Sequence, residues 1–233
     1  YAIERAFTDQ QMAAFDKTQI AAFKPTQVGA FTSSQINSMT TAQMSALTVS
    51  QVASLNTSRI KDIDSTRLGA LDSKQIQALT TAQVAVLGTG QVAALTAGSI
   101  GALSTAQVGA LTTSQVKVLT TANIVALSTA QVAALSTSQV AALTTGQVQA
   151  IATDDVKALT TSAVAALSTS QVQALSTAAV NALTTSQVTS LTTSQVSSLT
   201  TGEVAALNTS QVAALTTGQV QALTVSQLTS LSN

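Results

Sequence analysis

The sequence predicts an all-α fold, a tight solenoid built from very short helices. Three observations predict it. An eight-residue unit, here called an octad, recurs without insertion or deletion from Phe7 to Leu231. Each octad carries a helix-start signal and has only two large apolar positions. Because one octad cannot bury its apolar residues alone, neighbouring octads must stack and share a continuous core.

The helix-start signal is complete in the octad that begins at Leu207. Asn208 is suited to the N-cap, since its side-chain oxygen can accept from a free N–H of the first turn. Gln211, three residues later, can reach back to the N–H of the cap residue, which makes a capping box. Leu207 and Val212 stand at the two positions of a hydrophobic staple. The next octad then opens at Leu215.

The same positions recur along the whole chain. The first position is apolar from Phe7 to Leu231, and the staple position is apolar from Met12 to Leu228. The cap position holds Thr, Ser, Asn, Asp or Gly in every octad except those with Lys24 and Ala152. The box position holds Gln or Glu in most octads. The exceptions are Arg59, Arg67, Ser99, Asn123, Asp155, Ala163 and Ala179.

Other regular structures fit this spacing less well. A continuous helix would drift, because eight residues advance about 80° beyond two turns. A coiled coil needs a repeat of about seven or eleven residues. Pro25 follows a cap position, where a helix tolerates proline and a strand has no reason for it. A β-solenoid remains the alternative, because the chain is rich in threonine and valine.

The sequence also indicates how many octads form one superhelical turn. Glutamine occupies the position after the staple residue at Gln77, Gln149, Gln173 and Gln221, which are separated by multiples of three octads. This spacing predicts three octads per turn. Each helix is expected to have about six or seven residues, since eight positions include the cap and the bend.

Two regions differ in composition. Residues 1–75 hold 13 of the 18 charged residues and all four phenylalanines, so we expect divergent repeats that cap one end of the array. Tyr1 to Ala6 are expected to pack as part of that cap or to lead in from a preceding domain. Residues 76–233 form a uniform array whose exposed positions are small and neutral.

Composition argues against most kinds of chemistry. The chain has no cysteine and no histidine, so an enzyme is not expected, and we predict no catalytic, cofactor-binding or metal-binding residues. Asp62 with Asp64, and Asp154 with Asp155, could ligate calcium, but solvated or capping roles are favoured. A net charge of zero gives no basic footprint for nucleic acid. No apolar run is long enough to insert into a membrane.

The tract from Phe7 to Leu231 resembles the octapeptide segments, of the form Leu-Thr-Thr-x-Gln-Val-Ala-Ala, of large proteobacterial adhesin-like surface proteins. The resemblance implies an extracellular, repetitive, structural segment of a bacterial cell surface. Some of these proteins carry the label of heme utilization, but no heme site is implied here. The chain lacks histidine and cysteine, and Met12, Met39 and Met44 occupy core positions.

We therefore expect a structural repeat module of an extracellular filament or a cell-surface stalk, acting through length, stiffness and self-packing. Its expected partners are identical chains or fused domains of a larger protein. The alternative is a surface-binding module that recognises a glycan, ice or a protein. The irregular stretch 56–75 is the candidate for such a patch, because residues 76–233 show no break in their surface pattern.

Overall fold

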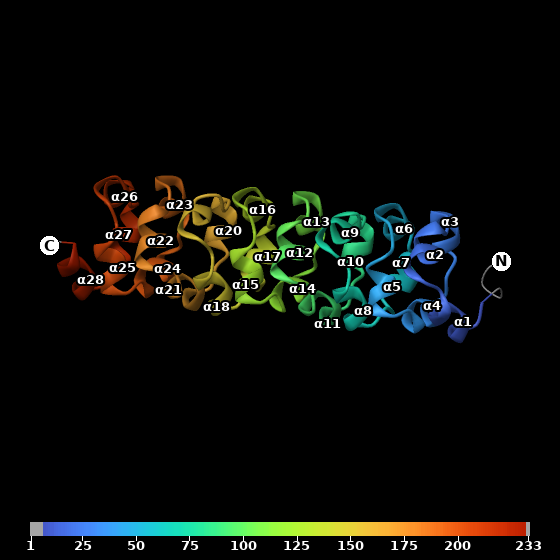
Figure 1. The fold of residues 1–233 in the computed structure, drawn as a ribbon. Coiled ribbons are helices and arrows are strands. Elements are labelled where there is room, and N and C mark those ends of the chain that lie inside the picture. The colour runs from blue at the N-terminus through green and yellow to red at the C-terminus, as the bar shows by residue number, and fades with distance from the viewer. Residues whose placement is uncertain (1–6, 232–233) are drawn as a thin grey trace. The chain divides into compact units, whose positions relative to one another are not determined.

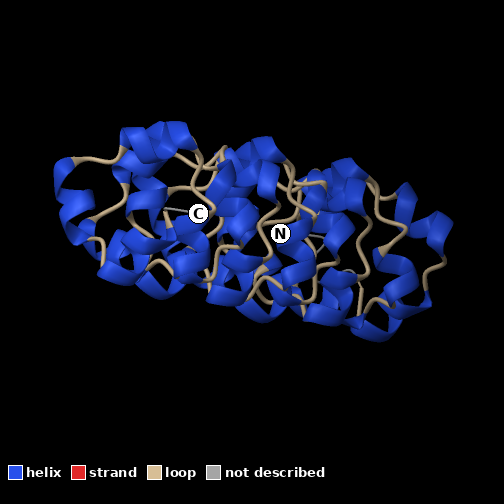
Figure 2. Cartoon of the chain, turned by 90° about the vertical axis from the view of Figure 1, so that its left-hand side faces the viewer, coloured by secondary structure: helices blue, strands red, loops and turns tan. Residues whose placement is uncertain are grey.

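A computed structural model describes residues 7–231, and all its regular structure is helical (Figure 1). Short loops join the helices, and the described residues contain no strand (Figure 2). The predicted all-α class is therefore confirmed, and the β-solenoid alternative is wrong. The expectation for Tyr1 to Ala6 lies outside the described residues. Two compact units divide the chain between Leu119 and Thr120.

Over the residues that the structure describes, each unit contains fourteen helices, one per octad. The first unit contains α1 (Asp9–Ala14), α2 (Lys17–Ala22), α3 (Pro25–Val28), α4 (Ser33–Ser38), α5 (Thr41–Met44), α6 (Val49–Ala53), α7 (Thr57–Ile60), α8 (Ser65–Gly69), α9 (Ser73–Gln77), α10 (Thr81–Ala85), α11 (Thr89–Ala93), α12 (Ala97–Gly101), α13 (Thr105–Ala110) and α14 (Thr113–Lys117). The second contains α15 (Thr121–Val125), α16 (Thr129–Ala133), α17 (Thr137–Ala142), α18 (Thr145–Gln149), α19 (Thr153–Val156), α20 (Thr161–Ala165), α21 (Thr169–Gln173), α22 (Thr177–Ala182), α23 (Thr185–Ser190), α24 (Thr193–Ser198), α25 (Thr201–Ala205), α26 (Thr209–Ala214), α27 (Thr217–Ala222) and α28 (Val225–Ser230).

Each helix begins at the predicted cap. Before α26, the Asn208 side chain accepts from the Gln211 N–H at 3.1 Å, and Gln211 Oε1 accepts from the Asn208 N–H at 2.8 Å. The described helices have four to six residues, so the lower end of the expected length of six or seven is met by helices such as α26, and the others are one or two residues shorter. Helix α26 ends at Ala214 because the next apolar residue, Leu215, has a non-helical backbone, with φ −58° and ψ 132°.

Within each unit, a helix packs on the third helix after it. Contacts of this kind join α1 to α4 and α10 to α13 in the first unit. In the second unit they join α20 to α23 and α24 to α27. Equivalent residues therefore stack every three octads, which confirms the predicted number of octads per superhelical turn. The bends require no left-handed backbone, because no described residue has a positive φ.

The core contains two side chains from each octad. Val188 and Leu191, for example, are 0% and 5% exposed, and the same two positions are buried in most octads of both units. At the beginning of the first unit, four phenylalanines form a cluster. Phe7, Phe15, Phe23 and Phe31 make edge-to-face contacts with ring centroids 5.1–6.1 Å apart. None of the described helices has the length and apolar character needed to cross a bilayer.

Candidate functional site

The box glutamines are the main polar feature of the fold, and they bond in two directions. Gln43 Oε1 accepts from the Thr40 N–H at 2.6 Å, as a capping box requires. Its Nε2 donates to the carbonyls of Phe15 at 2.7 Å and Met12 at 3.0 Å, one turn of the solenoid earlier. We call this set of box side chains and the carbonyls 28 and 31 residues before them the glutamine ladder.

The glutamine ladder recurs in both units. The bond to the carbonyl 28 residues earlier measures 2.5–2.8 Å throughout. In the first unit its donors include Gln35, Gln43, Gln51, Gln75, Gln83, Gln91, Gln107 and Gln115. In the second unit they include Gln171, Gln187, Gln195, Gln211, Gln219 and Gln227.

The ladder serves backbone groups that the short helices leave unpaired. The carbonyl 28 residues earlier belongs to the apolar residue at a bend, beyond the end of one helix and before the cap of the next. Such a carbonyl has no partner within a helix and is costly to bury without a donor. A glutamine amide supplies that donor, whereas a glutamate carboxylate cannot.

From the sequence we predicted that the box side chain accepts from the cap N–H. We did not predict that the same side chain donates to carbonyls of the preceding turn. A capping box accepts Glu as readily as Gln, yet Glu203 is the only glutamate at a box position in the chain. This imbalance was the available signal that the side chain must also donate. The box glutamines are accordingly buried, for example Gln51 at 0% exposure.

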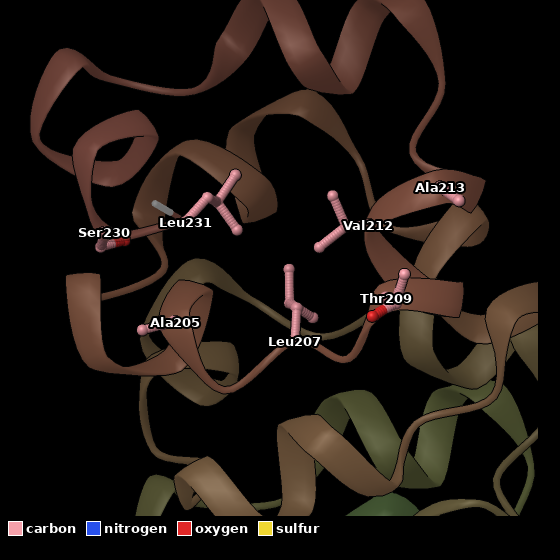
Figure 3. A pocket seen from close by; sticks show the side chains of 7 residues that line it. All are labelled: Ala205, Leu207, Thr209, Val212, Ala213, Ser230 and Leu231. Carbon is pink, nitrogen blue, oxygen red and sulfur yellow. The ribbon is translucent and has the colours of Figure 1, made fainter. Parts of the chain in front are cut away.

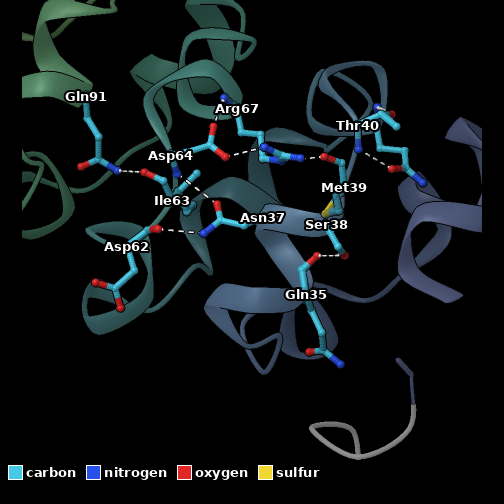
Figure 4. Close-up of polar contacts among 11 residues, drawn as sticks. Gln35, Asn37, Ser38, Met39, Thr40, Asp62, Ile63, Asp64, Arg67 and Gln91 are labelled. Carbon is cyan, nitrogen blue, oxygen red and sulfur yellow. Dashed lines mark hydrogen bonds and ion pairs between the residues drawn. The ribbon is translucent and has the colours of Figure 1, made fainter. Parts of the chain in front are cut away.

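Two arginines take the donor role in the first unit. Arg59 Nη1 donates to the carbonyls of Ala30 and Phe31. Arg67 Nε donates to the Met39 carbonyl at 2.7 Å (Figure 4). The stretch 56–75 is the region in which the sequence predicted a possible ligand-binding patch. Both of its arginines join successive turns of the solenoid.

Asp64 lies beside Arg67 and caps α8. Burial raises the pKa of Asp64, but hydrogen bonds from the Arg67 backbone and side chain, with the Arg67 charge, outweigh burial and lower it overall. The Arg67 N–H donates to Asp64 Oδ1 at 2.8 Å, and its guanidinium pairs with Oδ2 (Figure 4). Asp64 is therefore a charged cap that also orients a ladder donor.

Among the described residues beyond the first turn, five box positions do not supply the ladder donor. Ala163 and Ala179 are buried but have no polar side chain. Ser99 bonds to its own cap, Thr96, and Asp155 accepts from the Thr129 hydroxyl at 2.5 Å. Glu203 is 3% exposed, and its Oε1 has no hydrogen-bond partner among the described residues. Four of these five positions lie in the second unit.

A second set of amides joins the turns near the surface. Gln173 Nε2 donates to the Ser198 carbonyl and Asn181 Nδ2 to the Ala206 carbonyl, both at 2.7 Å and 25 residues later. Gly29 occupies the same octad position. A Cβ there would lie 2.7 Å from the Ser54 carbonyl oxygen, so only glycine fits this approach. Gln173 is one of the glutamines whose spacing indicated three octads per turn.

The acidic residues considered for calcium lie apart or have protein partners. Asp62 Oδ2 accepts from the Ser33 hydroxyl at 3.2 Å, and Asp64 is the cap described above. Asp154 pairs with Lys157 at 2.9 Å. Among the described residues, no group of three or more acidic, histidine or cysteine side chains gathers.

Hollows occur at the first and last turns. One of about 420 Å³ is lined by Ala205, Leu207, Thr209, Val212, Ala213, Ser230 and Leu231 (Figure 3). Another of about 320 Å³ is lined by Phe7, Gln11, Ala14, Phe15 and Gln19. In both, core-type apolar side chains line the hollow.

Capped octads joined by a side-chain ladder define a tandem-repeat solenoid, a structural repeat module. The chain belongs to the ALTTAQ repeat family, whose model matches residues 24–57, 60–97, 94–121, 119–153, 148–185, 172–201 and 201–233. No curated protein matches the chain.

Proposed function

We propose that this repeat module is part of an extracellular filament or a cell-surface stalk, and that it acts through length, stiffness and self-packing. The observation that carries the proposal is the glutamine ladder. Its polar side chains join one turn to the next, with donor–acceptor distances of 2.5–2.8 Å in the first unit and 2.6–2.7 Å in the second. Such a chain gains size by adding equivalent turns, since each repeat contacts only its neighbours.

The location at a bacterial cell surface rests on the resemblance of the octads to those of proteobacterial adhesin-like proteins. Antibodies against this chain, applied to intact cells of the source organism, test it. We expect labelling without permeabilisation. Labelling that appears only after the cells are opened would contradict a surface role.

The length of the repeat array is the property that tests the proposed spacer function. We expect duplication of one complete turn, residues 168–191, to increase the maximum dimension in small-angle X-ray scattering by a fixed step. Deletion of the same residues should decrease it by an equal step. Urea unfolding midpoints close to that of the parent chain would show that both variants keep the fold. Unequal steps, or no change in dimension, would contradict a spacer function.

One feature favours the alternative of a surface-binding module. Threonine occupies the first helical position of every octad from Thr105 to Thr217, and these side chains are exposed in most of them. A glycan array and an ice-recrystallisation assay would test recognition by this surface. Binding that is lost when several of these threonines become valine would support the alternative.

A further inference from the structure

Glu203 is a buried carboxylate with one oxygen that no described residue satisfies. The residue is 3% exposed. Its Oε2 accepts from the Thr200 N–H at 2.6 Å, as a capping box requires. Its Oε1 has no hydrogen-bond partner among the described residues. A carboxylate that is removed from water in this way needs a donor or a counter-charge at its second oxygen.

The neighbouring octads show which groups face this oxygen. Gln195 Nε2, in the preceding octad, lies 2.7 Å and 3.0 Å from two carbonyl oxygens of the turn before. The amide of Gln211, in the octad that follows, makes contacts of the same lengths. Since α25 packs on α22 as α24 packs on α21, the register is unchanged at Glu203. The carbonyls in register are those of Leu175 and Val172, so three oxygens meet at a point where an amide normally joins two.

The second unit contains no basic side chain that could neutralise Glu203. Lys157 is the only basic residue between positions 120 and 233. Its ammonium group lies 2.9 Å from Asp154 Oδ1, and 53% of its side chain is exposed. The next acidic box residue of the same register, Asp155, lies two turns earlier and is also negative. The charge that balances Glu203 must therefore come from solution.

We propose that Glu203 Oε1 and the carbonyl oxygens of Leu175 and Val172 bind a monovalent metal cation, sodium or potassium. Carboxylate and carbonyl oxygens are the ligands of hard cations, and backbone carbonyls can replace the hydration shell of an alkali-metal ion. One carboxylate balances one positive charge, whereas a divalent ion would leave a buried positive charge uncompensated. The ion takes the place of the missing ladder amide.

The sequence predicted no metal-binding residue, because two of the three ligands are main-chain groups of the preceding turn and carry no sequence signal. The site does not depend on the proposed spacer function. Its consequence is local, since the bound ion joins the turn of Glu203 to the turn before it as a glutamine would.

A proton on Glu203 Oε1 is the competing way to pair these oxygens. An O–H group has one hydrogen and bonds one carbonyl well, whereas the amide of a glutamine has two N–H groups and contacts two. A proton would therefore leave one of the two interturn contacts unmade, and a cation contacts all three oxygens. Dependence on pH and dependence on the identity of the cation distinguish the two cases.

Urea unfolding of the full chain in sodium, potassium or choline chloride, at equal ionic strength and neutral pH, tests the site. Choline matches the charge, but its three methyl groups prevent it from entering between the oxygens. A bound cation lowers the unfolding equilibrium constant about tenfold when its concentration is about ten times its Kd. We expect sodium or potassium to raise the urea midpoint above its value in choline.

Three variants show whether the response belongs to this carboxylate. Glu203→Gln restores the ladder amide, so it should lose the response and be more stable than the parent in choline. Asp154→Asn makes the same change in net charge at a side chain that is 88% exposed, and it should keep the response. Glu203→Gln combined with Gln195→Glu preserves net charge and moves the carboxylate to another buried box position, where the response should return.

Three results would overturn the proposal: equal midpoints of the parent in all three salts, a response that Glu203→Gln retains, or a double variant that does not respond. A parent midpoint that rises on acidification and is independent of the cation would assign a proton to Oε1 and would overturn it as well. Circular dichroism confirms that each variant is folded. None of these results changes the scattering dimensions that test the spacer function.

Discussion

Each box glutamine uses both ends of its amide, and the two ends have different requirements. Oε1 must accept from a cap N–H, which a glutamate can also do. Nε2 must donate to carbonyls of the preceding turn, which a carboxylate cannot do. A change from Gln to Glu therefore removes the ladder bond and keeps the cap, so the two contributions can be separated by one substitution.

Gln195→Glu makes this separation in the second unit. Gln195 donates to the Leu167 carbonyl at 2.7 Å and the Val164 carbonyl at 3.0 Å. We expect the variant to lose about 1–3 kcal/mol of stability, because a carboxylate oxygen then faces acceptors. Urea unfolding measures the loss. Gln173→Glu, at an exposed amide with one interturn bond, is the control and should lose less.

Glu203→Gln is the reverse change at a position that already lacks the donor. The unpaired Oε1 of Glu203 occupies the place of a ladder amide, and the carbonyls in register are those of Val172 and Leu175. Restoring the amide should raise stability by about 1–3 kcal/mol, the cost of a buried unsatisfied group. An unchanged urea midpoint would show that the ladder contributes little at this turn.

Asp64 makes the stability of the fold depend on pH in the acid range. Its pKa is below the ordinary value of 3.8 in the folded chain, so its contribution to stability is complete above that value and is lost as pH falls through the lowered pKa. The effect should be small, because 40% of the side chain is exposed. A carboxyl NMR titration should place the midpoint below 3.8, and Arg67→Gln should move it upward.

At the scale of the helix, stability comes from contacts made at the ends of each helix rather than from the number of residues in it. Helices of four to six residues are too short to form alone in water. Each is held by its cap, its staple and the turn on which it packs. The octad is therefore the smallest unit that can be removed without leaving a cap, a staple or a ladder position out of register.

Deletions of different length test this statement. Removing residues 184–191 deletes one octad and brings Leu183 next to Thr192, so the series of apolar, cap and box positions continues. Removing only residues 184–187 destroys one cap and one box. We expect the eight-residue deletion to unfold near the parent urea midpoint. The four-residue deletion should lose at least about 1 kcal/mol for the cap, with further loss from the displaced staple.

The sequence predicted the elements better than the contacts between them. Local signals such as Asn208 with Gln211 lie within four residues, so cap, box and staple could be assigned directly. The ladder joins Gln43 to Phe15, and a pairing across 28 residues depends on superhelical geometry that no local pattern encodes. For the same reason, Arg59 and Arg67 looked in the sequence like departures from the box pattern, although in the structure they replace glutamine as ladder donors.

At the scale of the whole molecule, the ladder is unevenly distributed. In the second unit, Asp155, Ala163, Ala179 and Glu203 leave the carbonyls of Leu127, Leu135, Ile151 and Leu175 without a ladder donor. The carbonyls of Leu183, Leu191 and Leu199, later in the same unit, all receive one. Since the core is equally buried in both parts, the difference in hydrogen bonding should decide which part opens first.

Hydrogen exchange should show this difference. We expect amides of residues 152–182 to exchange about tenfold faster than those of 184–199, because each missing bond lowers the local opening free energy by about 1 kcal/mol. Ala163→Gln with Ala179→Gln should remove most of the difference. The helices at these positions, α20 and α22, pack on their neighbours in the same pattern as glutamine-bearing helices.

Ser162→Gln distinguishes the ladder from a general effect of added glutamine. Ser162 is exposed and belongs to α20, the same helix as Ala163, but it does not lie at a box position. We expect it to leave exchange in residues 152–182 unchanged. If it slowed exchange as much as the two buried changes do, helix propensity rather than the ladder would set local stability. A selective response to Ala163→Gln and Ala179→Gln would instead show that the interturn amides determine which part of the array opens first.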